Sequence, residues 1–320
     1  MRVFVAGATG AIGRRLVPQL VARGHEVTAT TRSAGKADAL RALGATPVVV
    51  DGLDAAGIGE AVARSAPDAI VHQMTALAGK PDLKRFDRWF AQTNALRTAG
   101  TEHLLAAARA AGVERFVAQS YTGWTNAHTG SRVNTEDDPL DPAPAKAQRE
   151  TLAAIRFLED AVTAAPLHGI VLRYANFYGP GASDQLVELV RKRRMPVVGG
   201  GRGVWSWVHL DDAAAATVAA LERGAPGIYN VADDEPAEVA EWLPYLAEAV
   251  GAKAPPRVPA WLGRLAAGEA AVRWMTAGRG TSNEKAKREL DWRPAWTSWR
   301  DGFRHGLVDA SPASDRALAV

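Results

Sequence analysis

Short apolar runs alternate with longer amphipathic stretches through the first half of the chain. The runs are continuous, which is typical of strands buried on both faces of a parallel sheet. Six runs predict strands: Arg2–Ala6, Glu26–Thr30, Thr46–Asp51, Ala69–Gln73, Arg115–Ser120 and Gly169–Tyr174. Between them, apolar residues at helical spacing predict helices over Arg14–Leu20, Ala34–Leu43, Ile58–Ser65, Asp87–Ala111 and Lys146–Thr163. This alternation predicts an α/β fold, a Rossmann-type doubly wound parallel sheet covered by helices.

The second half of the chain is less regular. Residues 121–144 are rich in Thr, Asn, Gly, Asp and Pro, which predicts a long loop crossing the site. The turn Tyr178–Gly181 is expected to end the main run of strands, and Gly227–Val231 to return to the sheet. We therefore expect a dinucleotide-binding domain over residues 1–174, joined again by 204–234. A smaller, mostly helical lobe takes residues 175–203 and 235–306, and a frayed tail takes 307–320.

A glycine-spaced turn joins the first strand to the first helix. Gly7 would allow the tight turn, Gly10 the close approach of a phosphate, and Gly13 the packing of helix against strand. The bare backbone N–H groups and the helix N-terminus suit a pyrophosphate, although a purely structural glycine turn is the alternative. The residues expected to hold the pyrophosphate are Gly7, Thr9, Gly10, Ala11, Ile12, Gly13 and Arg14.

Composition removes several classes of function. With 47% hydrophobic and 23% charged residues in 320, the chain can bury a sizeable core. The net charge is only +3, and the cluster Arg191–Arg194 is interpreted as a solvated helix end, so no nucleic acid is expected. The absence of cysteine excludes disulfides and thiolate sites, and the seven histidines lack metal-ligand spacing, so no metal is expected. No run has membrane-spanning length, and a strand beginning at residue 3 leaves no room for a signal peptide; we expect a cytoplasmic protein without membrane contact.

Several motifs occur together in one order along the chain. They are Gly7–Gly13, Asp51, Ala69–His72, Arg115–Val117, Leu172–Gly181, Trp207–Asp212 and Asn283–Pro294. In this order, over about residues 1–305, the chain resembles the extended short-chain dehydrogenase/reductase superfamily of nucleotide-sugar epimerases, dehydratases and related reductases. The resemblance implies that the Rossmann-type domain holds NAD(H) or NADP(H) and that the C-terminal lobe shapes the pocket for a small-molecule substrate. It also implies a homodimer through the helices Asp87–Ala111 and Lys146–Thr163.

The choice of cofactor depends on the end of the second strand. Users of NAD place a carboxylate there, whereas this chain has Thr31 and Arg32. A guanidinium can pair with a 2′-phosphate, so we expect NADP(H) to be preferred, with NAD(H) possible; a surface role for Arg32 is the alternative. The resemblance implies that Asp51 binds the adenine amino group and that Leu53 packs on the ring. Further expected cofactor contacts are Gly52, Gln73, Met74, Tyr174 and Asn176.

One motif of the superfamily is missing. Its members carry Tyr-x-x-x-Lys on the helix before the sixth strand, where the phenol transfers a proton and the lysine lowers the pKa of that phenol. No tyrosine here has a lysine four residues later. Counting back from Arg173, with Glu159 as the glutamate that follows the lysine, the pair falls on Thr151 and Ile155. The superfamily's usual proton transfer is therefore not expected.

Other side chains near the fifth strand can replace the pair. Tyr121 stands where the superfamily's catalytic Ser/Thr commonly lies, flanked by Ser120 and Thr122 as alternative donors. Tyr121 either donates a proton or forms an amphipathic pocket wall, and the sequence is compatible with both roles. The expected substrate contacts are Trp124, Asn176 and Tyr178. His72 is expected to have a structural role.

Three functions remain compatible with the sequence. The favoured one is an NADP(H)-dependent oxidoreductase or epimerase/dehydratase-like enzyme that acts on a small, apolar or aromatic carbonyl or alcohol with a non-standard proton donor. Loss of Tyr-x-x-x-Lys motivates the second, a non-catalytic redox-sensing regulator. The third keeps the cofactor without net redox, as in an isomerase or cyclase.

Overall fold

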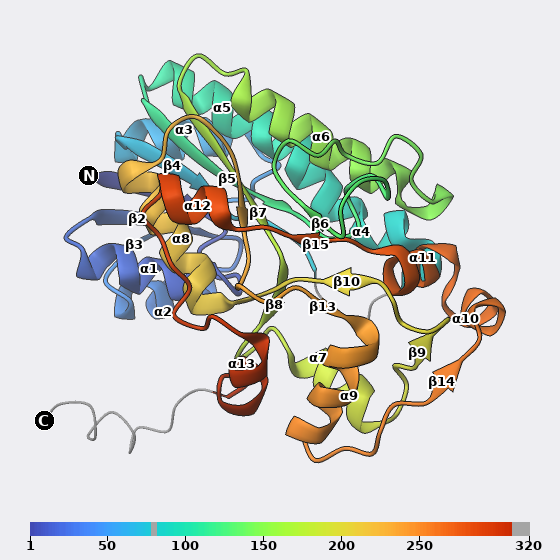
Figure 1. The fold of residues 1–320 in the computed structure, drawn as a ribbon. Coiled ribbons are helices and arrows are strands. Elements are labelled where there is room, and N and C mark those ends of the chain that lie inside the picture. Colours follow the sequence, from blue (N-terminus) through green and yellow to red (C-terminus); the bar gives the residue numbers. More distant parts are fainter. Residues whose placement is uncertain (78–81, 309–320) are drawn as a thin grey trace, which may run out of the picture.

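The computed structural model describes residues 1–77 and 82–308, and its centre is a seven-stranded parallel sheet (Figure 1). The strand order is β12-β7-β5-β4-β1-β2-β3, and every neighbouring pair is parallel. The strands are β1 (Arg2–Ala6), β2 (Glu26–Thr31), β3 (Thr46–Val49), β4 (Ala69–His72), β5 (Arg115–Tyr121), β7 (His168–Tyr174) and β12 (Gly227–Val231). The predicted fold class is confirmed, and Gly227–Val231 does return to the sheet.

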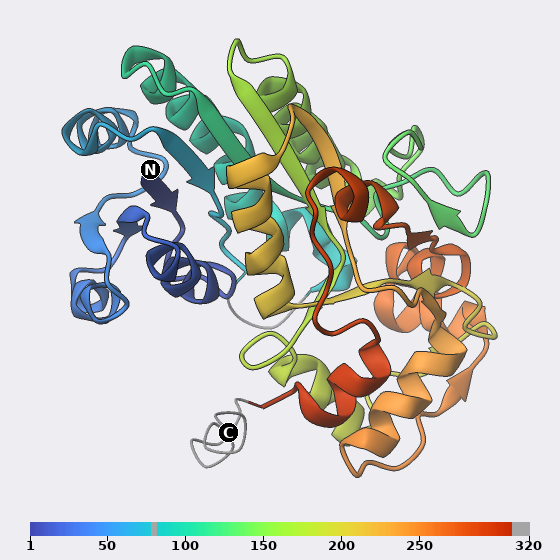
Figure 2. The same ribbon diagram turned by 60° about the vertical axis from the view of Figure 1, so that its left-hand side comes forward.

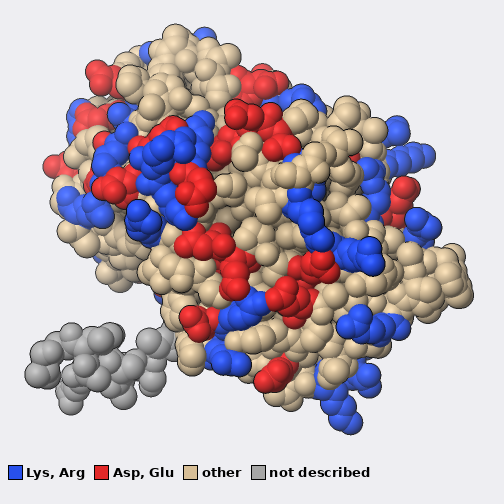
Figure 3. Space-filling model, in the orientation of Figure 1, with Lys and Arg blue, Asp and Glu red and all other residues tan. Residues whose placement is uncertain are grey.

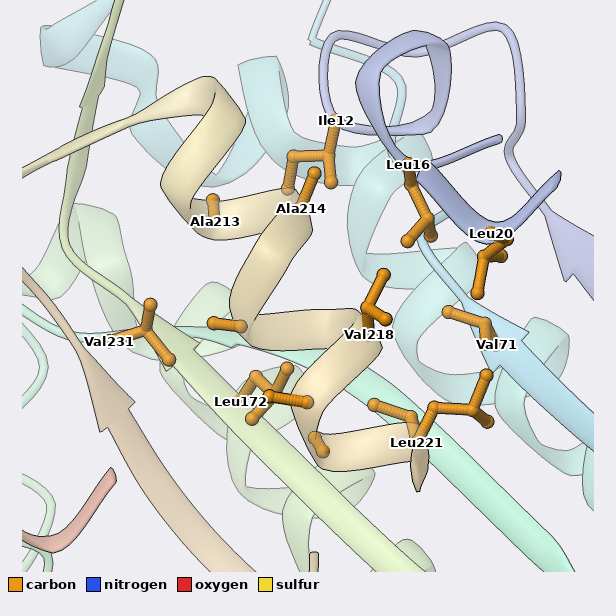
Figure 4. Close-up of a cluster of buried hydrophobic side chains, with 14 of the residues drawn as sticks. Ile12, Leu16, Leu20, Val71, Leu172, Ala213, Ala214, Val218, Leu221 and Val231 are labelled. Atoms are coloured by element: carbon orange, nitrogen blue, oxygen red, sulfur yellow. The ribbon is translucent and has the colours of Figure 1, made fainter. Parts of the chain in front are cut away.

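Helices cover both faces of this sheet because each face presents apolar side chains. One face packs against α1 (Gly13–Ala22) and α8 (Leu210–Arg223). Figure 4 shows Leu16 of α1 and Val218 of α8 meeting Val71 and Leu172 of the sheet. The other face packs against α3 (Ala55–Ser65), α5 (Thr101–Ala110) and α6 (Arg149–Thr163). A short turn, η1 (Ala34–Lys36), and α2 (Ala37–Ala42) lie between β2 and β3.

Several predicted elements differ from those observed. Strand β3 ends at Val49, so Asp51 lies beyond the strand. The helix expected over Asp87–Ala111 is interrupted: α4 (Phe86–Ala95) is followed by the π-helical turn η3 (Leu96–Gly100) and then by α5. The Nε2 atom of His72 lies 3.3 Å from the Leu96 carbonyl oxygen in this turn. The helix expected over Lys146–Thr163 begins with the short turn η4 (Lys146–Gln148), which is followed by α6. A similar short turn, η2 (Leu83–Arg85), precedes α4.

The C-terminal lobe combines helices with short strand pairs (Figures 1 and 2). Its helices are α7 (Asp184–Arg191), α9 (Val239–Ala249), α10 (Ala260–Ala267), α11 (Glu269–Ala277) and α13 (Trp299–His305). The strand pairs are β8 (Asn176–Tyr178) with β11 (Trp207–His209), β9 (Val197–Val198) with β14 (Arg257–Val258), β10 (Val204–Trp205) with β13 (Ala237–Glu238), and β6 (Val133–Asn134) with β15 (Gly280–Thr281). The turn expected over Tyr178–Gly181 is present from Gly179, one residue later than expected, because Tyr178 belongs to β8, which pairs with β11. Helix α12 (Glu284–Glu289) packs beside β12.

The surface carries charges of both signs. On the face seen in Figure 3, basic and acidic side chains are interspersed. Ion pairs between such groups include those of Lys287 of α12 with Asp234 and Glu284. Over the described ranges, no helix has the length and apolar character needed to cross a membrane. Of the expected frayed tail, Leu307 packs against the core of the C-terminal lobe, and residues 309–320 lie outside the described residues.

Candidate active site

The glycine turn has the geometry that a pyrophosphate requires. Gly7 has a φ of +92°, and a Cβ there would stand 2.6 Å from the backbone of Gln73. A Cβ on Gly13 would stand 2.5 Å from the carbonyl oxygens of Gly7 and Ala8, so the start of α1 is pressed against the turn. A Cβ on Gly10 would meet only the Gly7 oxygen, at 3.3 Å, and Gly10 is exposed. The turn is therefore closed on its inner side and open where a phosphate would approach.

The N-terminus of α1 is electrostatically ready for an anion. No side chain caps it, and its first turn contains no acidic residue. The N–H groups of Arg14, Arg15 and Leu16 already donate to the carbonyls of Gly10 and Ile12, so this end of α1 attracts a phosphate through the positive end of the helix dipole. The backbone of the turn is fixed to β2, because the Gly7 N–H donates to Oγ1 of Thr30 at 3.1 Å. The residues present fit the pyrophosphate of a dinucleotide.

The rim of this site carries the residues expected to bind the adenosine half. Asp51 is exposed, and its Oδ1 accepts a hydrogen bond from the Leu53 N–H at 3.0 Å. Leu53 is 37% exposed. Met74 fills the space over Gly52, where a Cβ would stand 2.3 Å from the Met74 sulfur. The loop is thus shaped to present one free carboxylate oxygen and one apolar side chain at the cofactor edge of the sheet.

Two exposed arginines, Arg14 and Arg32, lie at the same edge. Arg32 follows β2 and is exposed, while the neighbouring Thr31 is buried and its hydroxyl bonds the backbone of Ser33. Arg14 is exposed on α1, and its Nη2 atom would be 3.3 Å from a Cβ on Gly181. Neither Arg14 nor Arg32 makes an ion pair with the described part of the chain. Both guanidinium groups are available to a ligand.

Gln73 and Tyr174 lie deeper than expected for direct cofactor contacts. The Gln73 amide donates to the Tyr174 hydroxyl at 3.1 Å, and that hydroxyl lies 2.7 Å from Oγ1 of Thr217. Burial raises the pKa of Tyr174 to about 12, so its phenol stays protonated. Tyr174 is 1% exposed and belongs to the core under α8. The Oε1 atom of Gln73 is buried without a hydrogen-bond partner and is the polar atom of this pair available to a ligand.

Tyr121 ends β5, and its phenol is hydrogen-bonded to Asn176 of β8. Its hydroxyl donates to Oδ1 of Asn176 at 2.8 Å, and the Asn176 amide donates to the Ser206 carbonyl at 3.0 Å. Burial raises the pKa of Tyr121 well above its usual range, and the nearby positive charge of Arg97 offsets this only in part. Tyr121 is therefore a neutral hydrogen-bond donor at ordinary pH.

An aromatic cluster adjoins Tyr121. Trp124 has its ring 6.4 Å from that of Tyr121 and meets Phe86 edge-on at 5.2 Å. Phe86 in turn stacks on Phe90 at 4.5 Å. Trp124 is only 6% exposed, so it is packed into this cluster rather than standing free in a pocket. The cluster gives the surroundings of Tyr121 a flat, apolar character.

The two alternative donors are engaged with protein groups. The Ser120 hydroxyl donates to Oε1 of Glu159 at 2.7 Å, and Glu159 is held in a buried bidentate pair by Arg173 at 2.8 and 2.6 Å. The Thr122 hydroxyl lies 2.8 Å from that of Thr281. Ser120 thus belongs to the ion pair that ties α6 to β7, and Thr122 to a contact with β15.

The positions that correspond to the missing pair have structural partners. The Thr151 hydroxyl donates to Asp87 at 2.6 Å and accepts from the Asn94 amide at 3.1 Å. Ile155 is 1% exposed and belongs to a buried apolar cluster with Phe86 and Trp124. At the position of the superfamily's lysine, this chain has the hydrocarbon side chain of Ile155. At the position of its catalytic tyrosine, it has Thr151, whose hydroxyl joins α4 to α6.

Tyr178 does not join this group. It is 0% exposed, and its ring packs against His209 at 5.2 Å and Phe303 at 5.6 Å in the core of the C-terminal lobe. A Cβ on Gly302 would stand 2.3 Å from its hydroxyl. The substrate contact expected of Tyr178 is therefore corrected to a packing role, because the strand pair β8–β11 turns this side chain into the lobe.

His72 has the structural role expected of it. Its Nδ1 atom accepts from the Met74 N–H at 3.2 Å, while its Nε2 faces the Leu96 carbonyl in η3. Complete burial lowers the pKa of His72 to about 4, so the ring is neutral. The imidazole therefore couples the end of β4 to the π-helical turn.

The residue that the sequence interpretation missed is Arg97, which lies in η3. It is 7% exposed, its Nη1 atom is buried without a hydrogen-bond partner, and its guanidinium lies 5.6 Å from the centre of the Phe90 ring. A pattern could have found it: Phe90, Arg97 and Leu104 share the apolar face of the predicted helix. A charged residue on the apolar face of a helix is rarely buried unless it is paired, so it indicates a functional or ion-pairing role.

Comparison with known proteins agrees with this site. Residues 3–232 match the model of the NAD dependent epimerase/dehydratase family, and the chain belongs to that family. A Streptomyces 3-diazoavenalumate denitrifying reductase is 45% identical over 310 residues, covering 95% of this chain and 99% of the relative. A Stigmatella aurantiaca 4-hydroxy-2-methyl-3-oxo-4-farnesyl-3,4-dihydroquinoline-1-oxide ketoreductase is 31% identical, covering 79% and 75%.

A solved structure supports the same assignment. The UDP-glucose 4-epimerase of Thermus thermophilus in complex with NAD is 26% identical, with a TM-score of 0.71 over 100% of both chains. The chain is therefore an NAD(P)-dependent enzyme of the short-chain dehydrogenase/reductase type.

Proposed function

We propose that this enzyme is an NADPH-dependent reductase of a small aromatic compound, and that the compound carries a diazo group. The observation that carries the proposal is the replacement of the superfamily's proton-transfer pair by Thr151 and Ile155, both tied into packing. The Streptomyces relative, whose alignment covers almost all of both chains, is named for the removal of nitrogen from a diazo compound. The aromatic cluster around Tyr121 and Trp124 suits a flat ring.

Diazo reduction explains why a tyrosine–lysine pair is dispensable. Reduction of a ketone leaves an alkoxide that needs a proton in the transition state, which is the task of that pair. When an arenediazonium group accepts a hydride, the carbon–nitrogen bond breaks, dinitrogen leaves and a carbon–hydrogen bond forms in net terms. No alkoxide arises at the reacting carbon. The bound dinucleotide supplies the hydride, and the protein supplies position, a dry site and hydrogen-bond donors.

The state of Tyr121 agrees with this chemistry. A catalytic tyrosine of the superfamily needs a lowered pKa, whereas burial raises the pKa of Tyr121. Its hydroxyl is held toward Asn176 and can orient an oxygen of the substrate without losing its proton. We infer that Tyr121, Trp124 and Asn176 position the substrate.

Carbonyl reduction is the second candidate function. The Stigmatella relative is named as a ketoreductase, and the ordered Tyr121–Asn176 pair places a phenolic donor where an alkoxide could receive a proton. In that case Tyr121 is the non-standard proton donor expected from the sequence, and its pKa must fall when cofactor and substrate bind.

For the cofactor, we infer that NADP(H) is preferred over NAD(H). The support is the exposed, unpaired guanidinium of Arg32 at the end of β2, with a second one at Arg14. No carboxylate stands at the end of β2 to bind the ribose hydroxyls of NAD.

We also infer a homodimer through α5 and α6. A groove of about 440 Å³ lies between these helices, and Phe157 beside it is 36% exposed. Light scattering should give twice the chain mass for the native protein and the chain mass for Phe157→Glu; a monomeric native protein would contradict the inference.

One experiment separates the candidate functions. NADPH oxidation is followed at 340 nm with a 2-diazophenol, and the phenol product is quantified against the uncatalysed rate. The diazo candidate predicts one phenol per NADPH, and a Tyr121→Phe variant within about tenfold of the native kcat, since no general acid is lost. The carbonyl candidate predicts turnover of a ketone or enone instead, with a loss of about 100-fold or more in Tyr121→Phe.

Two further outcomes would contradict both candidates. Tight NADPH binding without turnover of any of these compounds would favour the redox-sensing regulator. Conversion of a substrate without net NADPH consumption would favour a cofactor-retaining isomerase or cyclase.

A further inference from the structure

Among the described residues, Arg97 is a buried cation that forms no ion pair. Within residues 1–77 and 82–308 it makes no hydrogen bond and no ion pair, and its Nη1 atom is enclosed without a partner. The carboxylate whose charge acts on Arg97 is that of Glu159, which is engaged elsewhere because it accepts two hydrogen bonds from Arg173 and one from Ser120. Two guanidinium groups thus share one carboxylate, and the local charge is unbalanced.

Packing alone does not explain why a charge stands here. Burial lowers the pKa of Arg97 to about 10, so it is still a cation at neutral pH. The Phe90 ring at 5.6 Å provides a cation–π contact, which is weak compared with the desolvation of an unpaired guanidinium. An unpaired buried charge is expected to have a partner in the functional state.

The surroundings indicate what kind of partner it would be. Arg97 contacts Phe90, which stacks on Phe86, which meets Trp124, whose ring neighbours Tyr121. Arg97 and Tyr121, at the two ends of this series of rings, are close enough for the positive charge of Arg97 to act on the Tyr121 phenol. A cation and a neutral phenol donor therefore stand at the two ends of an arc of aromatic faces.

The π-helical turn η3 is what holds Arg97 there. Such turns insert one residue into a helix and are frequent at functional sites. The turn is anchored by His72, whose Nε2 faces the Leu96 carbonyl one residue before Arg97. The placement of the guanidinium therefore depends on the end of β4, at the cofactor edge of the sheet.

We propose that Arg97 binds an anionic oxygen of the aromatic substrate, a phenolate or a carboxylate, while the ring of the substrate lies against the aromatic cluster. The proposal rests on the proposed function for its aromatic substrate class. The charge of the ligand supplies the counter-ion that the protein lacks, so anionic rings are selected over neutral rings of the same shape.

The test measures binding, so it is independent of turnover. The protein loaded with NADP⁺ is titrated at pH 8 with two matched pairs, using tryptophan fluorescence: 4-nitrophenolate with 4-nitroanisole, and cinnamate with cinnamamide. Variants are Arg97→Met, Arg97→Lys and, as a control, Arg88→Met, which removes an exposed arginine of α4. Weaker binding of 4-nitrophenolate to Arg97→Met would indicate a phenolate ligand, and weaker binding of cinnamate would indicate a carboxylate ligand.

The expected result is a loss of at least tenfold in affinity for one anionic probe in Arg97→Met, with the neutral partner changed less than twofold. Arg97→Lys should recover part of the loss, and Arg88→Met should behave as the native protein. The melting temperature of Arg97→Met without ligand should stay the same or rise, since an uncompensated charge is removed.

Three results would overturn the proposal. These are equal losses for anionic and neutral probes, a loss confined to NADPH affinity, and a marked fall in the melting temperature of Arg97→Met. A loss confined to NADPH affinity would show that Arg97 binds the cofactor. A marked fall in the melting temperature would show that Arg97 stabilises the fold. A failure of diazo or carbonyl turnover leaves these binding measurements unaffected.

Discussion

A Cβ atom on Gly123 would stand 2.7 Å from the hydroxyl oxygen of Tyr121, so the phenol lies directly against this glycine. Gly123 has a φ of +145°, a conformation that L side chains rarely adopt. The orientation of Tyr121 toward Asn176 therefore depends on the absence of a side chain two residues away.

Gly123→Ala should displace the Tyr121 phenol and strain the backbone. We expect a loss of about 1–3 kcal/mol in the free energy of unfolding and a rise of about tenfold in substrate KM, with unchanged NADPH affinity. Urea denaturation and steady-state kinetics measure these quantities. Gly112→Ala is the control, because Gly112 also has a positive φ, +67°, but a Cβ there would meet nothing within 4 Å. Equal KM values in the two variants would contradict the role of Gly123.

Arg32→Ala should weaken NADPH binding selectively. A charge-assisted hydrogen bond to a phosphate contributes about 1.5–3 kcal/mol, so the Kd for NADPH should rise by about 10- to 100-fold while the Kd for NADH stays constant. Isothermal titration calorimetry measures both. Arg64→Ala, which removes an exposed arginine of α3, should change neither constant. A native protein that binds NADH as tightly as NADPH would refute the inferred preference.

Acid should destabilise the protein through His72. Burial lowers its pKa from 6.5 to about 4, so below pH 6.5 the unfolded chain binds a proton that the folded protein does not. The contribution to stability is complete above pH 6.5 and is lost as the pH falls toward 4. Between pH 7 and pH 5 the native protein should lose about 2 kcal/mol from this residue. Urea denaturation at both pH values should show that loss reduced in His72→Gln and retained in His168→Gln, where the histidine is exposed. An identical pH dependence in both variants would argue against the neutral, buried imidazole.

Restoring the lysine of the superfamily should not restore its chemistry. Ile155→Lys places an ammonium among the apolar side chains of Phe86, Trp124 and Leu152. The carboxylate of Glu159, on the same helix, is already bound by Arg173. We expect a loss of about 2–5 kcal/mol in the free energy of unfolding and no gain in ketone reduction. Ala153→Lys on the exposed side of α6 is the control and should cost much less. A stable Ile155→Lys variant would show that this cluster is less tightly packed than the structure indicates.

The sequence by itself predicted the sheet, the order of its helices and strands, and the glycine turn. These depend on local patterns: continuous apolar runs, helical spacing, and glycines at positions that allow no Cβ. Residues near the ends of β2, β3, β4 and β5 could also be assigned to one edge, because all strands of a parallel sheet end at the same side.

Only the tertiary structure decided which of those side chains are accessible and what each one contacts. Tyr178 was expected at the substrate, but the pairing of β8 with β11 buries it in the other lobe. Ser120 proved to be bonded to Glu159, a residue 39 positions away in the sequence. Arg97 forms no ion pair within the described residues, because Glu159, whose charge acts on it, is held by Arg173 from another segment. No local pattern specifies whether a buried charge is paired. Burial and pairing are properties of long-range packing, so the chemistry of this site becomes visible only in the folded chain.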